Sequence, residues 1–390
     1  MTYPIDDVKL ARVRRRMADE DLDALVCRAP DNLLYLTNYW CMKGYDMVVF
    51  PRDGDPTLVV IEPQEDDARR TAWTGDVRLF ASYHPADPRP PTARSLDMCL
   101  EVLAERDLLG RVGVELTNGS QSADRMVGEP TVYTAPYFDA FAPVVREVVD
   151  AVPLLTGVRA TKTAQEVERM RLANELAALA VEHVRERIRP GMRESEVGAM
   201  FEGHVHEVGI GYQGRVDMAR AYTLVWSGPG IKTFTCTGAR PVVEDEPTLL
   251  EIWVCADGYW CDLTKNVCPG TLTRPYDTLL DQLLGVFGEA AAYARPGASL
   301  AELDRSIREG LAAAGYPGQP SHPVCHGVGA RAHEPPWAHQ GDEQPIREGM
   351  VLAIEPGVYW EGGGGLRLED DFLITSAGSE KLCTSPDDFR

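Results

Sequence analysis

A helix–turn–helix–strand pattern occurs twice in this chain, about a hundred residues apart, and it limits the possible folds more than any other feature. The first copy opens with a capping box at Thr163 and carries an apolar stripe at three- and four-residue spacing up to an Arg-Pro-Gly at 189–191. The second copy begins near Pro275 and stops at the same tripeptide at 295–297. Each Arg-Pro-Gly is followed by the second helical pattern of its copy, which ends in Gly-Tyr at 211–212 and at 315–316. We expect a duplicated unit with a pocket between its halves, the alternative being a chance similarity of two helical hairpins.

Acidic residues inside apolar strands recur at the same spacing. The first hairpin-like segment contains Glu251 and Asp262, and the second, which has a glycine-rich turn, contains Glu355 and Glu369. Burial of a carboxylate is unfavourable unless the group is paired or binds a metal ion. Four such acids at symmetry-related positions therefore indicate a cation between them.

Two histidines lie in the segment SHPVCHGVGARAHEPPW, namely His326 before a Gly-Val-Gly and His333 seven residues later. An imidazole beside carboxylates favours manganese, iron, cobalt or zinc over calcium or magnesium. Two such ions about 3.5–4 Å apart would acidify a bound water and create a nucleophile. We therefore expect one or two divalent transition-metal ions as the cofactor.

The first part of the chain reads as a separate α/β domain. A helical pattern at 8–17, an apolar strand at 23–28 and a hairpin over 47–62 alternate there. Residues 152–163 read as a connection between domains, so we expect domains at 1–155 and 156–390.

Composition excludes several classes of protein. With 390 residues the chain has room for two or three domains, and its net charge of −21 disfavours nucleic-acid and membrane-surface partners. No apolar run approaches the roughly 20 residues of a membrane span. The first residues lack the apolar core of a signal peptide, and the nine cysteines form no Cys-x-x-Cys pair. We expect a cytoplasmic protein with mostly buried free thiols.

The blocks HGVG…HE, GMVLAIEPG and LRLEDD together resemble the pita-bread metallopeptidase family, which includes methionine aminopeptidase, aminopeptidase P, prolidase and the non-peptidase creatinase. PDNLLYLT at 30–37 is similar to the creatinase-type N-terminal domain. The resemblance implies an α/β (α+β) fold, with a creatinase-like domain over 1–155 and a pita-bread catalytic domain with pseudo-two-fold halves over 156–390. It also implies a homodimer.

The resemblance gives roles to individual residues. Asp262 is similar to the second, bridging aspartate of the family, His326 to its metal histidine and Glu369 to its final bridging glutamate. Glu355 resembles the glutamate that serves as ligand and proton shuttle. His333 matches the histidine that polarises the substrate carbonyl.

Two positions depart from the family pattern. Glu251 replaces the first aspartate, and its extra methylene leaves three outcomes open: a compensating backbone, a monodentate ligand or the loss of one metal. Thr235 stands about where the peptidases have a histidine that contacts the substrate amide, after the turn at 227–229. Without that histidine, general-acid assistance to a leaving amine is weakened, typically by about 10²–10⁴-fold.

The leading hypothesis is a hydrolase resembling Xaa-Pro dipeptidase and aminopeptidase, acting through a metal-bound hydroxide on a short peptide. The alternative keeps the fold and acts on a small molecule, by elimination as in dimethylsulfoniopropionate lyases or by metal-free C–N hydrolysis as in creatinase. A non-catalytic binding module is a third reading, which five retained candidate ligands disfavour.

Other residues near the motif blocks bear on the substrate. Arg331 and Arg367 are candidates to hold a substrate carboxylate, although an ion pair with a ligand is the expected role. Five of the seven tryptophans lie in or beside the motifs, which suits either core packing or an aromatic pocket for a small cation. They are Trp226, Trp253, Trp260, Trp337 and Trp360.

Overall fold

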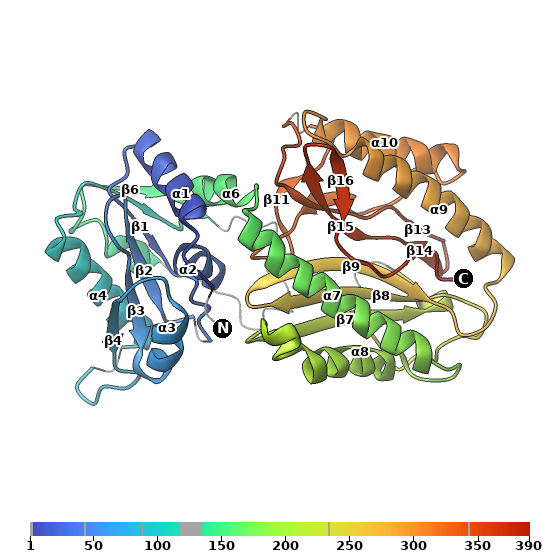
Figure 1. Ribbon diagram of the computed structural model, residues 1–390, viewed down its shortest axis with the longest axis horizontal. Helices are drawn as coiled ribbons and strands as arrows, with labels where there is room; N and C mark the ends of the chain where they lie inside the picture. The colour runs from blue at the N-terminus through green and yellow to red at the C-terminus, as the bar shows by residue number, and fades with distance from the viewer. Residues whose placement is uncertain (1–2, 43, 88, 118–134, 233–234, 342–343) are drawn as a thin grey trace. The chain divides into compact units, whose positions relative to one another are not determined.

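The computed structural model describes residues 3–42, 44–87, 89–117, 135–232, 235–341 and 344–390, and the chain divides into two compact units, Met1–Arg159 and Ala160–Arg390 (Figure 1). The sequence placed the division after residue 155. Residues 152–159 instead form a helix, α6 (Val152–Arg159), which lies against α1 (Asp7–Asp19) in the first unit. The apolar side chains of α6 are buried there, so the first unit extends to the end of this helix.

A six-stranded mixed sheet forms the centre of the first unit, in the order β4-β3-β2-β1-β5-β6. Its strands are β1 (Ala24–Cys27), β2 (Met47–Pro51), β3 (Thr57–Ile61), β4 (Asp76–Phe80), β5 (Arg111–Val114) and β6 (Glu147–Asp150). The remaining helices are α2 (Pro30–Thr37), α3 (Glu65–Thr71), α4 (Pro91–Glu105), α5 (Ala135–Asp139) and the short η1 (Glu62–Gln64). The antiparallel pairing of β2 with β3 confirms the predicted hairpin.

Alternate residues of these strands supply two separate cores, because successive side chains of a strand point to opposite faces. Leu25 and Phe50 pack with α1, α2 and α6 on one face, whereas Val26 and Val49 pack with α4 and α5 on the other. Both faces of the sheet are therefore covered, as expected for an α/β domain.

Two long helices cover one face of a three-stranded antiparallel sheet in the first half of the second unit. These elements are α7 (Ala164–Arg187), α8 (Glu194–Gly209), β7 (Ala219–Ser227), β8 (Thr248–Ala256) and β9 (Tyr259–Val267), with the short turns η3 (Tyr212–Gly214) and η4 (Gly228–Gly230). The predicted capping box is present: Thr163 accepts from the backbone of Glu166, whose carboxylate accepts from the Thr163 backbone. The helix start is thus fixed locally.

The second half repeats this plan. Its helices are α9 (Arg274–Tyr293) and α10 (Leu300–Ala313), and its strands are β10 (Cys325–Gly327), β11 (Glu334–Trp337), β12 (Val351–Ile354), β13 (Gly357–Tyr359), β14 (Gly365–Arg367), β15 (Asp370–Thr375) and β16 (Gly378–Lys381). Five strands form a sheet in the order β11-β10-β12-β15-β16, while β13 and β14 pair separately around the glycine-rich turn. In Figure 1, β9 of the first half lies beside β14 and β15 of the second.

The sheets meet on the face that points away from α7 and α8. Leu250, Ile252 and Leu263 lie in the core under those helices, so the alternating residues Glu251 and Asp262 face the other half. Thr264 forms a β-bridge with Glu369 there. The pairing of β8 with β9 and the bridge from β9 to Glu369 therefore bring Glu251, Asp262 and Glu369 to one side of the sheet.

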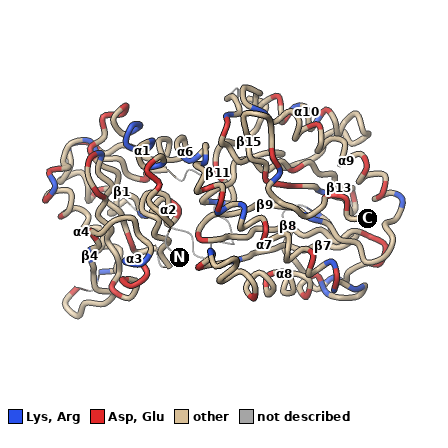
Figure 2. The backbone as a smooth tube through the Cα atoms, in the orientation of Figure 1, with Lys and Arg blue, Asp and Glu red and all other residues tan. Residues whose placement is uncertain are grey.

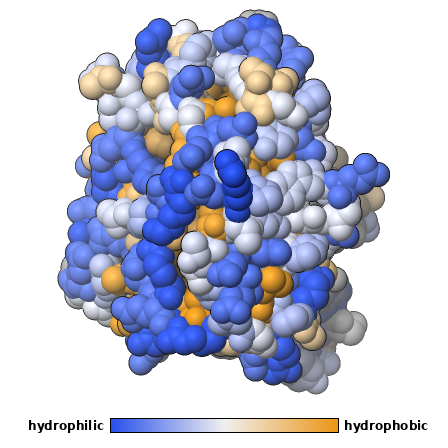
Figure 3. All heavy atoms as spheres, turned by 90° about the vertical axis from the view of Figure 1, so that its right-hand side faces the viewer, coloured by the Kyte–Doolittle hydropathy of each residue, from blue (hydrophilic) through white to orange (hydrophobic). Residues whose placement is uncertain are grey.

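Basic and acidic residues, blue and red in Figure 2, occur along the chain in both units. Hydrophilic residues cover most of the face shown in Figure 3, with apolar side chains between them only in small patches. Of the helices in the described ranges, none combines the length and hydropathy needed to cross a bilayer.

Candidate metal centre

Strands and the loops beside them supply the site. The candidate residues are Glu251 on β8, Asp262 on β9, His326 on β10, His333 just before β11, Glu355 just after β12 and Glu369 between β14 and β15. All except Glu251 and His333 are buried. A buried, strand-mounted set of this kind holds its ligand atoms with little freedom.

The ligand atoms fall into two overlapping groups. Within the described residues, one atom each from Asp262, His326 and His333 lies within 4.8 Å of the others, and the same holds for His326, Glu355 and Glu369. His326 Nε2 lies near a carboxylate of each group, 3.6 Å from Asp262 Oδ2 and 3.7 Å from Glu355 Oε1. The fold thus brings together four of the five residues that the sequence suggested as metal ligands.

Glu251, the fifth candidate, is engaged elsewhere. Its Oε2 lies 2.7 Å from Nη2 of Arg367, whose guanidinium also donates to Thr264 Oγ1 at 2.7 Å. Arg367 is buried, whereas the Glu251 side chain is 16% exposed, so water reaches the ion pair only from the glutamate side. Of the two roles considered for Arg367, the structure displays the ion pair with a candidate ligand.

The carboxylates strongly perturb one another's pKa values. Burial, followed by the charges of Glu369, Glu251 and Glu355, raises the pKa of Asp262 well above its ordinary value. Burial and the charge of Glu355 likewise raise the pKa of Glu369. Although burial acts in the same direction on Glu355, His322 and His326 hold the pKa of this residue below normal. Such a set of competing acids is stabilised by a positive ion at its centre.

The donor atoms suit a divalent transition metal. Asp262 Oδ2 is buried and faces two imidazole nitrogens, His333 Nε2 at 3.1 Å and His326 Nε2 at 3.6 Å, without a well-aligned hydrogen bond in the described part of the chain. Carboxylate oxygens together with an imidazole nitrogen match the preferences of manganese, iron, cobalt and zinc. The residues present therefore fit the cofactor that the sequence predicted.

Two further residues, which the sequence analysis did not single out, complete the surroundings of Glu355. His322 places Nδ1 3.3 Å from Glu355 Oε2, and its Nε2 lies 3.1 Å from the hydroxyl of Tyr359. That hydroxyl in turn is 3.3 Å from Arg367 Nη1. The signal for His322 was its position four residues before His326 in the same histidine-containing block.

The tryptophans separate into different environments. Trp253 lies beside the site, with its ring centroid 6.0 Å from that of His333 and 5.6 Å from that of Tyr222. Trp337 has its centroid 5.4 Å from His326. Trp226 instead belongs to a small apolar core.

Of the other two, Trp360 packs on Tyr276 with ring centroids 4.7 Å apart, and Trp260 is partly exposed on β9. Trp226 and Trp360 thus suit core packing, whereas Trp253 and Trp337 suit an aromatic wall near the site.

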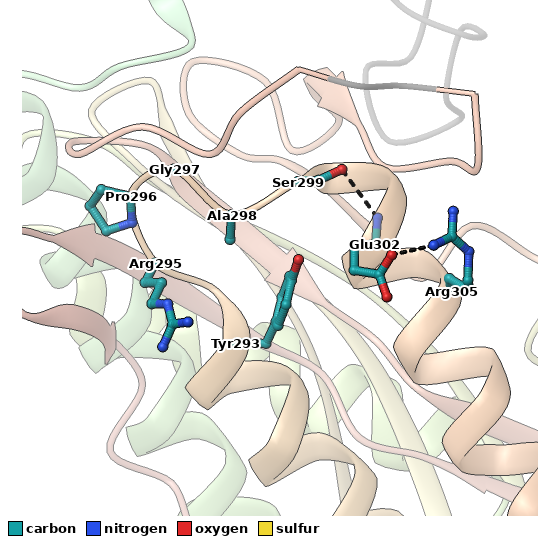
Figure 4. A pocket seen from close by; sticks show the side chains of 8 residues that line it. All are labelled: Tyr293, Arg295, Pro296, Gly297, Ala298, Ser299, Glu302 and Arg305. Carbon is teal, nitrogen blue, oxygen red and sulfur yellow. Dashed lines mark hydrogen bonds and ion pairs between the residues drawn. The ribbon is translucent and has the colours of Figure 1, made fainter.

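A polar pocket of about 730 Å³ opens at the turn between α9 and α10 (Figure 4). Ser299 there accepts from the backbone of Glu302, whose carboxylate pairs with Arg305. These lining groups satisfy each other, and none of them is a candidate ligand, so the pocket adds nothing to the metal centre.

The fold and this ligand set define a metal-dependent hydrolase of the prolidase and creatinase superfamily. Residues 168–376 match the profile of Metallopeptidase family M24, and residues 9–127 match that of the Creatinase/Prolidase N-terminal domain. The chain belongs to metallopeptidase family M24.

Relatives and solved structures agree with this assignment. The chain is 29% identical to the Xaa-Pro dipeptidase of Pyrococcus furiosus over 96% of this chain and 97% of that protein. It is 24% identical to a putative dipeptidase of Bacillus subtilis over 97% and 98% of the two chains. The prolidase structure from Pyrococcus horikoshii superposes with a TM-score of 0.79 at 22% identity, covering 98% of this chain and 100% of that one. This likeness establishes the pita-bread fold with a creatinase-like N-terminal domain.

Proposed function

We propose that this protein is a metal-dependent hydrolase of the amide bond next to proline in a short peptide. The observation that carries the proposal is the convergence of Asp262, His326, Glu355 and Glu369 from four separate segments on one buried place. The similarity over nearly the full chain to an Xaa-Pro dipeptidase supports the choice of substrate.

Asp262, His326, Glu355 and Glu369 would hold the metal. A divalent ion supplies Lewis-acid activation of water and of the scissile carbonyl in a site of this kind. Manganese, iron, cobalt and zinc all suit the donor set, and we propose that the functional ion is one of these.

Glu355 is suited to move a proton between water and the leaving amine. Its Oε2 faces His322 Nδ1 at 3.3 Å, and this contact fixes the orientation of the carboxylate. Because the pKa of Glu355 is held below its ordinary value, its carboxylate is ionised at neutral pH.

His333 is suited to stabilise the developing oxyanion. Its side chain is 25% exposed, whereas those of Asp262, His326 and Glu369 are at most 3% exposed, so a substrate can reach it. Its Nε2 lies 3.1 Å from Asp262 Oδ2, which orients the ring. A donor aimed at developing negative charge lowers the barrier to amide hydrolysis.

The decisive experiment is a turnover assay with the full-length, metal-loaded protein on a panel of Xaa-Pro dipeptides and Xaa-Pro-Xaa tripeptides. We expect hydrolysis of at least one member, and loss of at least 100-fold in kcat for Glu355→Gln, as befits removal of a proton-transfer group. Absence of turnover across the panel in protein with confirmed metal content would overturn the proposal.

A second candidate substrate is a small methylated zwitterion, which the enzyme would cleave by elimination or C–N hydrolysis. Trp253 favours this alternative, because its ring lies next to His333 and ring faces attract sulfonium and quaternary ammonium groups. A screen with such compounds in parallel with the peptides distinguishes the two. Turnover of a methylated compound alone would support the alternative.

A further inference from the structure

Glu194, the first residue of α8, carries a fully buried carboxylate outside the metal centre. The backbone N–H groups of Ser227 and Gly238 donate to it at 2.9 and 3.1 Å. Arg240 donates from Nε at 2.9 Å and places Nη2 2.7 Å from the second oxygen. Hydrogen bonds to an ionised carboxylate are stronger than neutral ones, and four nitrogens occupy the acceptor sites that it offers. Glu194 therefore holds its three partners firmly in place.

These partners belong to the connection between β7 and β8, which the structure describes over residues 227–232 and 235–240. The α8 helix lies beside β7 (Figure 1), and its backbone joins the same contact, because Glu194 N donates to Arg240 O at 3.0 Å. A Cβ at Gly230 would lie 2.9 Å from Glu194 Oε1, so the chain passes the carboxylate closely. Glu194 thus fixes the connection where it leaves β7 and again before it returns to β8.

The same connection supports the glycine-rich turn of the second half. Gly364 N donates to Ile231 O at 3.2 Å, and a Cβ at Gly363 would lie only 2.2 Å from Pro229 O. Ile231 is fully buried in the small apolar core against which Tyr359 packs. The position of β13, which contains Tyr359, therefore depends on the position of the connection.

Tyr359 links this core to the candidate active site. Its hydroxyl lies 3.1 Å from His322 Nε2, and His322 Nδ1 faces Glu355 Oε2 at 3.3 Å. Packed side chains and hydrogen bonds thus run without interruption from Glu194 through Ile231 to Glu355. A continuous set of contacts of this kind can carry energetic coupling between distant residues.

We infer that Glu194 is a positioning residue of the candidate active site. It fixes the β7–β8 connection and, through Ile231 and Tyr359, the orientation of His322 and Glu355. Within the described residues, Glu194 belongs to neither group of candidate ligand atoms, so it acts without holding the metal. The catalytic consequence rests on the proposed function, whereas the structural coupling does not.

Hydrogen–deuterium exchange of the full-length protein tests the coupling without any substrate. Glu194→Gln keeps the size of the side chain but removes its charge and one acceptor oxygen. Because the bonds to the connection weaken, exchange should accelerate about tenfold in 227–232 and also in 357–367, which contains β13 and β14. An increase confined to 227–232 would overturn the inference, because the connection would then move without Tyr359.

Glu166→Gln is the matched control. Glu166 is 2% exposed and accepts from the Thr163 backbone at 2.9 Å, so the same change is made at a buried carboxylate at the start of α7. Exchange in 357–367 should stay within about twofold of wild type, and an acceleration equal to that of Glu194→Gln would overturn the inference. If Glu194→Gln does not fold, Arg240→Gln leaves both backbone donors in place. It should accelerate exchange in 357–367 about threefold, and no acceleration there would also overturn the inference.

Steady-state kinetics test the catalytic consequence. On the best Xaa-Pro substrate, kcat of Glu194→Gln should fall about 10–100-fold, because a small displacement of the reacting groups has an effect of this size. KM and the Kd for Mn²⁺ should stay within about threefold of wild type, and Glu166→Gln should keep its kcat to within about twofold. An equal loss of kcat in both variants would show a general structural effect and contradict the positioning role.

The two failures can be told apart. A wild-type protein that hydrolyses no Xaa-Pro peptide, but whose Glu194→Gln variant exchanges faster in 357–367, would remove the proposed function and keep the coupling. Hydrolysis by wild type with unchanged exchange in 357–367 of the variant would do the reverse.

Discussion

Lys162 Nζ lies 3.0 Å from Glu334 Oε1, and the two side chains are only 1% and 3% exposed. Glu334 follows His333 directly, and Lys162 precedes the capping box that opens α7. Gly329 in the His-Gly-Val-Gly block leaves the room for this pair, since a Cβ there would come within 2.4 Å of Glu334 Oε1 and 2.9 Å of Lys162 Cε. The pair thus links the start of the second unit to the segment that carries the candidate ligand His326 and the nearby His333.

Glu334→Ala should lower the free energy of unfolding by about 3–5 kcal/mol, because it leaves the Lys162 ammonium buried beside no carboxylate from this position. Urea denaturation followed by tryptophan fluorescence measures the loss. The control is the double variant Lys162→Met/Glu334→Leu, which removes both charges and should lose less than Glu334→Ala. A double variant that is less stable than the single one would contradict the argument.

Metal binding should stabilise the protein more at pH 8 than at pH 5. The raised pKa values of Asp262 and Glu369 mean that the folded metal-free protein retains protons that the unfolded chain has lost, so its stability falls as the pH rises above about 4. Glu355, with its lowered pKa, is ionised over this whole range and does not alter the sign.

Differential scanning fluorimetry with and without Mn²⁺ at both pH values measures this effect. At 100 times its Kd an ion adds about 2.7 kcal/mol, which for a unit of this size corresponds to several degrees in Tm. Ca²⁺ is the control and should give a smaller shift, since it disfavours the nitrogen ligand. An Mn²⁺ shift that is equal at the two pH values would count against the mutual repulsion of the carboxylates.

Because of Asp46, the free energy of unfolding of the first unit should decrease as the pH rises from 4 to 8. Burial raises the pKa of this carboxyl to about 7, although Ile61 N and Tyr39 hydroxyl donate to it at 2.9 and 2.7 Å. The folded state therefore keeps a proton that the unfolded chain loses near pH 4, and stability declines through this window by at most about 4 kcal/mol.

Native-state hydrogen exchange of the β3 amides, corrected for the intrinsic pH dependence, reports this decline locally. Asp46→Asn removes the titration and should flatten the profile between pH 4 and pH 8. Asp53→Asn is a suitable control, because its side chain is 93% exposed. An unchanged slope in Asp46→Asn would show that another group is responsible.

Thr235→His should raise the rate of peptide hydrolysis if the missing amide-contacting histidine limits turnover. Thr235 Oγ1 is buried and has no hydrogen-bond partner in the described part of the chain, whereas residues 233–234 of the same segment lie outside it. General-acid assistance is worth about 10²–10⁴-fold, so an increase of at least tenfold in kcat is expected.

The measurement is kcat on the best Xaa-Pro substrate, with Thr235→Phe as a control for bulk without a titratable group. An equal change in both variants would show that ring size, and not proton transfer, is responsible.

Much of the fold could be predicted because its signals are local. The capping box at Thr163 and the apolar spacing after it define α7 within a few residues, and the alternation around Glu251 and Asp262 defines β8 and β9. These patterns depend on hydrogen bonds and side-chain periodicity between near neighbours, so they are visible in the chain itself.

The neighbours of Glu355 could not be predicted in the same way. His322 was inside a block that the sequence analysis had already quoted, yet nothing in its spacing shows that its ring lies against Glu355 and Tyr359. These contacts join the segment before β10 to Glu355 after β12 and to Tyr359 on β13, and they depend on the packing of the whole half.

The amino-acid sequence by itself determined the duplicated plan, the acidic character of the strands and the identity of the candidate ligands, because residue type and spacing carry that information. Only the tertiary structure decided which candidate ligands converge, and that Glu251 forms an ion pair with Arg367. The pairing of Glu251 with Arg367 joins residues more than a hundred positions apart. Such a contact arises from the register of β8, β9 and β14 together, and a longer acidic side chain turns to whichever cation the folded chain places beside it.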